Sequence, residues 1–245
     1  MGKLKAGTWG VAAIALGAAV MVPVHASDQT ALLIEAEGRA AAFDLAGAAD
    51  LLRNAGRTDL DAQVAGVYAR GLIDAREASR SGGSVESLMP VRNAIGWLEI
   101  VASGRPGPAE ISRLVLQAAA AAAQSEREEM RLYLDTAIRM EMLQRAAGLP
   151  GAPLITAAEA AGELWLQVHR YAEATKAYQE AAAGAGLSPR VLAGLGRAGR
   201  GANDVVAACA AFRALLDEWE GRAELPAEVA DARGYVMESC AGQGG

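Results

Sequence analysis

Glycine, proline and polar breaks divide this chain into a succession of short segments, and this punctuation constrains the fold more than any other feature. No segment combines the two-residue alternation of a β-strand with β-branched enrichment, so strands are not expected. Of all residues, 52% are hydrophobic but only 4% are aromatic, because alanine supplies much of the apolar count. Alanine is the best helix former. The sequence therefore predicts an all-α fold.

The segments are predicted to be helices, and several begin at capping residues or prolines. They span residues 29–42, 45–55, 59–79, 85–103, 108–123, 126–147, 154–168, 171–184, 190–199, 203–220 and 226–240. They form pairs whose second members recur every 30 to 45 residues or so, roughly the spacing of helical repeat arrays. One such pair cannot bury its apolar faces alone, so we expect the pairs to stack into a solenoid with a continuous core.

Residues 155–182, ITAAEAAGELWLQVHRYAEATKAYQEAA, carry the clearest pattern of small and large residues. The residues that define it are Gly162, Trp165, Tyr171, Ala174, Tyr178 and Ala181. In this order they resemble a tetratricopeptide repeat, in which small residues lie where helices touch and large residues fill the gap to the next repeat. Two positions depart from the family pattern. Ala161 replaces a large apolar residue, and Pro189 comes later than usual, so an irregular turn between repeats is expected.

Residues 191–216, VLAGLGRAGRGANDVVAACAAFRALL, match the same pattern less fully. The matching positions are Leu192, Leu195, Gly196, Ala208, Phe212 and Leu215. Gly199 replaces the expected aromatic residue, and 43–55 and 91–102 carry only fragments. The resemblance implies a right-handed α-solenoid of antiparallel helix pairs, clearest over 155–216. It divides the chain into degenerate helical repeats (27–150), tetratricopeptide-like repeats (151–220), and a C-terminal capping helix and tail (221–245).

The N-terminus is typical of a secretory signal peptide. Two lysines precede an apolar run over 11–22, and 24–26 places small residues at the positions that signal peptidase recognises. Cleavage between Ala26 and Ser27 is predicted. The run is shorter than the roughly 20 residues of a membrane-spanning helix. The alternative is an uncleaved anchor, which would be the chain's only membrane contact. The predicted location is the bacterial periplasm, or outside the cell.

Charge and cysteine content fit this compartment. Without residues 1–26 the chain has 21 basic and 29 acidic residues, a net charge of −8, which disfavours binding to nucleic acid. Cys209 and Cys240 both belong to the exported part. An even count in an oxidising compartment predicts a disulfide, and two buried free thiols are the alternative.

The sequence offers little for catalysis. After the signal peptide the chain has one histidine, His169, in the turn between the helices of the clearest repeat, and no zinc-ligand spacing. The stretch GLGRAGRG (194–201) lacks the preceding strand of a phosphate-binding loop. Acidic clusters at 128–129 and 217–220 are interpreted as a solvated face. No enzymatic activity, cofactor or metal is expected.

Binding is the better prospect. The groove positions implied by the resemblance are Glu159, Glu163, Leu166, Gln167, Arg190, Arg197 and Arg200. Three arginines on one helix face would suit carboxylates or an acidic peptide through bidentate hydrogen bonds. The alternative is that these are ordinary surface charges, with Arg197 paired to Glu163 across the repeat junction.

The sequence therefore favours an exported scaffold or adaptor that binds a protein or peptide partner in the cell envelope. One alternative is an envelope enzyme or enzyme subunit, such as an accessory of a cell-wall hydrolase. Another is a carrier of a small ligand, which would need a closed apolar pocket rather than an open groove.

Overall fold

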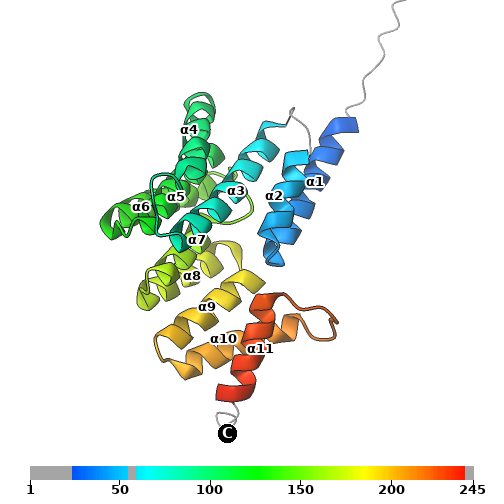
Figure 1. Cartoon of the computed structure of the whole chain (residues 1–245). Coiled ribbons are helices and arrows are strands. Elements are labelled where there is room, and N and C mark those ends of the chain that lie inside the picture. The colour runs from blue at the N-terminus through cyan, green and yellow to red at the C-terminus, as the bar shows by residue number, and fades with distance from the viewer. Residues whose placement is uncertain (1–23, 55–58, 241–245) are drawn as a thin grey trace, which may run out of the picture.

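Figure 1 presents the fold as a computed structural model, which describes residues 24–54 and 59–240. Within these ranges the chain forms eleven α-helices and no β-strand. The helices are α1 (Val24–Ala41), α2 (Leu45–Asn54), α3 (Leu60–Arg80), α4 (Met89–Gly104), α5 (Pro108–Ala123), α6 (Arg127–Ala146), α7 (Ala157–Gln167), α8 (Tyr171–Ala185), α9 (Pro189–Gly201), α10 (Val205–Glu218) and α11 (Ala227–Ser239). The predicted all-α class is confirmed.

Most of the predicted signal peptide lies outside the described residues, and so does the predicted tail over 241–245. Helix α1 begins at Val24 and includes the predicted cleavage position between Ala26 and Ser27. Signal-peptide cleavage therefore stays a prediction from the sequence.

Most helix boundaries lie within a few residues of those predicted. Among the helices that follow α1, the start of α4 differs most from the prediction. This helix was predicted from residue 85 but begins at Met89. The hydroxyl of Ser84 instead accepts the N–H of Ser87 at 3.2 Å, in a turn before the helix. Pro90 explains the late start: a helix from residue 85 would place it in the interior, where its missing N–H leaves a carbonyl without a donor.

Each helix packs against the next one in the sequence, in antiparallel pairs. The odd-numbered helices α3, α5, α7, α9 and α11 also contact one another in succession. Each even-numbered helix from α4 to α8 packs between two odd-numbered ones. The odd-numbered helices thus form a continuous row, and this row places their side chains on one shared surface.

A close approach of glycine to an aromatic ring recurs in the last two pairs. A Cβ atom placed on Gly162 of α7 would lie 2.7 Å from ring carbons of Tyr178 of α8. Gly196 of α9 faces the ring of Phe212 of α10 in the same way, and both residues follow their counterparts by 34 positions. Gly194 of α9 closes on the Tyr178 ring from the next helix. The small and large residues of the sequence pattern are therefore packing partners.

The turn of the N-terminal helix pair contacts the C-terminal helices. Cys209 in α10 and Cys240 at the end of α11 form a disulfide, with Cα atoms 5.8 Å apart. The turn between α1 and α2 reaches the same region, where the ring centroids of Phe43 and Trp219 lie 6.5 Å apart. Figure 1 shows this turn facing the C-terminal helices. The α1–α2 turn is thus in contact with the end of α10, which is far away in the sequence.

Candidate functional site

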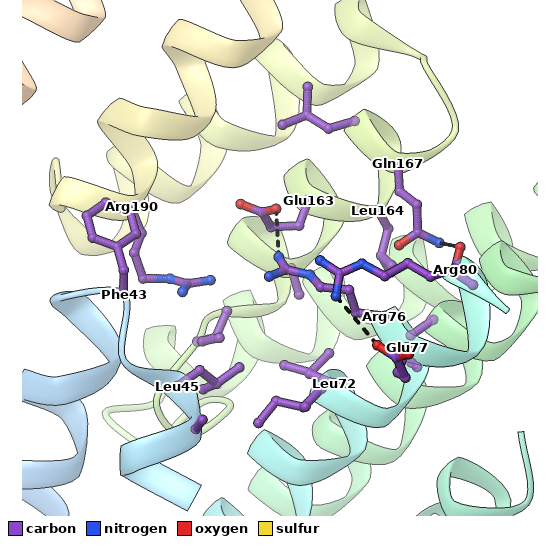
Figure 2. A pocket seen from close by; sticks show the side chains of 18 of the residues that line it. Phe43, Leu45, Leu72, Arg76, Glu77, Arg80, Glu163, Leu164, Gln167 and Arg190 are labelled. Carbon is purple, nitrogen blue, oxygen red and sulfur yellow. Dashed lines mark hydrogen bonds and ion pairs between the residues drawn. The ribbon is translucent and has the colours of Figure 1, made fainter. Parts of the chain in front are cut away.

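A cavity of about 660 Å³ lies against the row of odd-numbered helices. Its apolar wall includes Phe43, Leu45, Leu72, Ile155, Leu164 and Leu166. Its polar lining includes Arg76, Glu77, Ser79, Arg80, Glu163, Gln167, Arg190, Arg197 and Glu228. Four arginines and three glutamates therefore face one space, in a protein whose overall net charge is −6. Figure 2 shows the labelled side chains converging from α3, α7, α9 and the α1–α2 turn.

Glu163 in α7 is the centre of the charged cluster. Both η nitrogens of Arg197 donate to its carboxylate, and Arg76 approaches Oε2 at 3.4 Å. The hydroxyl of Tyr178 donates to Oε1 at 2.8 Å. Burial raises the pKa of Glu163, but the charge and hydrogen bonds of Arg197, with the charges of Arg190 and Arg76, outweigh it and set the pKa at about 2. Glu163 is therefore an anion at neutral pH, with most of its accepting capacity filled.

Arg190, which lines the cavity, forms a second ion pair with Glu159, which lies behind the wall. The ε nitrogen of Arg190 lies 2.6 Å from Oε1 of Glu159, and the two side chains are only 11% and 9% exposed. Burial raises the pKa of Glu159, and the charge of Arg190 offsets part of that rise. In the part of the chain that the structure describes, no acceptor is recorded for the η nitrogens of Arg190. Figure 2 shows its guanidinium pointing into the cavity.

Arg76 and Arg80 lie one turn apart on α3 and are more exposed than Arg190. Their side chains are 55% and 68% exposed. Arg80 pairs with Glu77 at 3.5 Å, and the contact of Arg76 with Glu163 is similarly long. The pair of Arg80 with Glu77 is exposed on both sides and contributes about 0–1 kcal/mol, so Arg80 can change partner at low cost. The partner of Arg76 is more buried, because the Glu163 side chain is only 19% exposed.

The structure places five of the seven predicted binding residues on the cavity: Glu163, Leu166, Gln167, Arg190 and Arg197. Gln167 is fixed there, because its Nε2 donates to the Ser79 hydroxyl at 2.9 Å. Glu159 lies behind the wall and is 7% exposed.

Arg200 points elsewhere. It pairs with Asp231 of α11 at 2.9 Å and lies 5.9 Å from the ring centroid of Tyr235. Of the three arginines predicted to share one binding face, Arg190 and Arg197 therefore line the cavity and Arg200 does not. The ion pair between Arg197 and Glu163, which the sequence raised as an alternative, is present.

Sequence reasoning missed Phe43, Arg76 and Arg80. The two arginines share a face of α3 at a spacing of four residues, but this helix carries no recognisable repeat pattern that would assign the face to the cavity. Phe43 is one of only two phenylalanines, and it comes directly after a predicted helix. That position gave no indication of a contact with residue 219.

The residues that the sequence raised for catalysis, phosphate binding or metal binding lie outside the charged cluster. His169 lies in the exposed turn between α7 and α8, with Nδ1 3.1 Å from the Tyr171 hydroxyl. The glycine-rich stretch 194–201 is the body of helix α9. The described residues contain no group of three or more His, Cys, Asp or Glu side chains placed to hold a metal ion.

In the described ranges, no helix is both long enough and apolar enough to cross a membrane. Comparisons with family models, with curated proteins and with solved structures found no match to this chain.

Proposed function

We propose that the chain is an exported binding protein of the bacterial cell envelope, whose cavity holds an acidic segment of a protein or peptide partner. The observation that carries the proposal is the arrangement of Arg76, Arg80 and Arg190, which line one cavity and keep N–H donors beyond those used in their ion pairs with glutamates. In this proposal the helix pairs are tetratricopeptide-like repeats of a right-handed α-solenoid. The 34-residue recurrence of the glycine–aromatic contact and the continuous row of odd-numbered helices support that assignment.

The charge of the cavity supports an acidic ligand. Arginine presents a planar fork of donors that matches a carboxylate, and such pairs are stronger when they are partly shielded from water. A ligand carboxylate can recruit Arg76 without leaving Glu163 unpaired, because Glu163 keeps Arg197 and Tyr178. The apolar wall at Leu72 and Leu164 offers contact for the neighbouring side chains of the segment.

The test is calorimetric titration with acetyl-Leu-Glu-Glu-Leu-Glu-amide and with its counterpart in which glutamine replaces every glutamate. We expect the acidic peptide to bind, to bind more weakly as salt is added, and to lose at least about tenfold in affinity in Arg76→Gln/Arg80→Gln. Arg200→Gln is the matched control, because that arginine pairs with Asp231 outside the cavity. Equal affinity for both peptides, or an unaffected double variant, would overturn the proposal.

One observation favours a second candidate, a small-ligand carrier. Phe43 and Leu45 add an apolar wall to the cavity, and the volume of the cavity lies within the range of roughly 300–1,000 Å³ seen for small-molecule sites. Octanoate, which joins a carboxylate to an apolar chain, is the probe for this candidate. Binding of octanoate without binding of the acidic peptide would favour the carrier.

Export is tested separately. We expect protein isolated from the envelope of its native cell to begin at Ser27 in N-terminal sequencing, because the peptidase pattern ends at Ala26. A retained Met1 would contradict cleavage and favour the anchor.

A further inference from the structure

A second, smaller cavity adjoins the candidate site. Its volume is about 210 Å³, and its lining comes from α9, α10 and α11, which pack together at the C-terminal end of the array (Figure 1). The lining residues are Ala193, Arg197, Phe212, Ala227, Glu228 and Asp231. Arg197 and Glu228 line the first cavity as well, so the two cavities meet at these side chains. A segment bound in the first cavity can therefore extend into the second.

The floor of this second cavity is apolar. Ala193 and Phe212 are each 1% exposed. The Phe212 ring is fixed from two sides, because it contacts Gly196 and meets the ring of Tyr235 edge-on, with centroids 5.4 Å apart. The volume lies below the range of roughly 300–1,000 Å³ seen for small-molecule sites. The second cavity therefore suits one side chain rather than a whole small molecule.

The charges around the second cavity leave one carboxylate without a counter-charge. Arg197 is committed to Glu163, and Asp231 is paired with Arg200 at 2.9 Å. Glu228 is half-buried and makes no hydrogen bond or ion pair with any of the described residues. A partly desolvated carboxylate gains most from a cationic hydrogen-bond donor. The side chain that fits this cavity is therefore a basic one with an apolar stem.

Helix α9 sets the distance between the two cavities. Arg190, Ala193 and Arg197 follow one another at steps of three and four residues, so they share one face of the helix. At a rise of about 1.5 Å per residue, the second cavity lies about 5–10 Å along the helix axis from Arg190. An extended segment covers that distance in two or three residues, at about 3.3 Å per residue.

We propose that the second cavity binds a lysine side chain of the same segment whose carboxylates the arginines hold. The ammonium group of this lysine pairs with Glu228, and its aliphatic stem lies against Ala193 and Phe212. Arg197 repels it little, because Glu163 largely neutralises that arginine. This inference rests on the proposed function and narrows it: the preferred partner carries a lysine two or three residues from a glutamate.

The first test adds lysine to the acidic probe peptide. Four peptides carry it two or three residues before the first glutamate or after the last, which covers both chain directions. Four counterparts carry norleucine, which has the same stem without the ammonium group. In calorimetric titration, at least one lysine peptide should bind about fivefold more tightly than its norleucine counterpart, the scale of one ion pair. Equal affinities within all four pairs would overturn the lysine site and leave the acidic site standing.

Glu228→Gln should abolish this preference for lysine over norleucine. Glu238→Gln is the matched control, because it removes the same charge from the same helix at an exposed position that lines neither cavity. The control variant should keep the preference. A preference that persists in Glu228→Gln would show that lysine binds elsewhere and would overturn the assignment.

The second test does not require the acidic peptide to bind. Nα-acetyl-lysine methylamide is titrated in the millimolar range into isotope-labelled protein, and the norleucine analogue is the control. In nuclear magnetic resonance spectra, only the lysine compound should shift the amide signals of Ala193, Ala227 and Glu228, and Glu228→Gln should remove the shifts. The absence of lysine-specific shifts would overturn the lysine site. Lysine-specific shifts in a protein that does not bind the acidic peptide would uphold the lysine site and overturn the proposed acidic ligand.

Discussion

At the scale of single residues, the spacing of the last helix pairs depends on glycines that admit aromatic rings. Gly162→Leu should lower the free energy of unfolding by about 1–3 kcal/mol, because the new side chain would collide with the Tyr178 ring in a packed interior. Urea unfolding measures the change. Gly96→Ala in α4 is the control: nothing lies within 4 Å of its added Cβ, and the loss of a helical glycine should raise stability by up to about 1 kcal/mol. An unchanged midpoint for Gly162→Leu would contradict this packing.

Glu163 gives a second prediction at this scale, a dependence on pH. Its pKa is about 2 in the folded protein, against an ordinary value of 4.5. A depressed pKa means that the carboxylate stabilises the fold fully above pH 4.5 and loses that contribution as the pH falls through 2. Glu163→Gln should therefore cost about 3 kcal/mol at pH 7, and the difference from the unaltered protein should shrink steadily between pH 4.5 and pH 2.

Urea unfolding of both proteins at several pH values measures this difference, and global charge effects largely cancel in it. Glu180→Gln is the control, because its ion pair with Lys176 is exposed and 3.9 Å long. That change should cost no more than about 0.5 kcal/mol at any pH. A constant difference between Glu163→Gln and the unaltered protein down to pH 2 would show that Arg197 does not hold the Glu163 charge.

At the scale of elements, the last helix depends on its covalent tie. Helix α11 has neighbours on one side of the array, so it should fray most readily. The disulfide closes a loop of 31 residues, for which the chain-entropy model gives about 3–4 kcal/mol. Reduction should therefore speed hydrogen exchange first in α11 and leave α7 and α8 protected. Uniform loosening of all helices would contradict a local role for the bridge.

The helices themselves could be predicted from the sequence, because capping residues, prolines and glycines act locally. Thr156, for example, is the N-cap of α7, and its hydroxyl accepts the N–H of Glu159 at 3.1 Å. Contacts between adjacent helix pairs were partly predictable for the same reason, and Arg197 does reach Glu163. Contacts from helices far away in the sequence could not be predicted. Arg76 meets Glu163 across 87 positions, and nothing local to α3 sets that register.

At the scale of the whole molecule, the contact between the α1–α2 turn and the end of α10 changes how stability is shared. In an array whose helix pairs touch only their neighbours, a change in the C-terminal helices can affect the N-terminal pair only by passing through all the pairs between them. Here Trp219, at the end of α10, touches Phe43 directly. The stability of helices α10 and α11 should therefore be coupled to that of the α1–α2 pair.

A double-mutant cycle tests this coupling with four proteins: the unaltered chain, Phe43→Ala, Cys209→Ser/Cys240→Ser, and the combination. Loss of the bridge loosens α11, whose Val229 and Ala232 lie in one apolar cluster with Trp219, so it should weaken the Phe43–Trp219 contact and destabilise α2. Once Phe43 is alanine there is no contact left to weaken. The combined loss in free energy of unfolding should then fall short of the sum by about 0.5–1.5 kcal/mol, the scale of an aromatic pair. Hydrogen exchange locates the effect: removing the bridge should speed exchange in α2 only while Phe43 is present. Additive losses with unchanged exchange in α2 would mean that the ends touch without sharing stability.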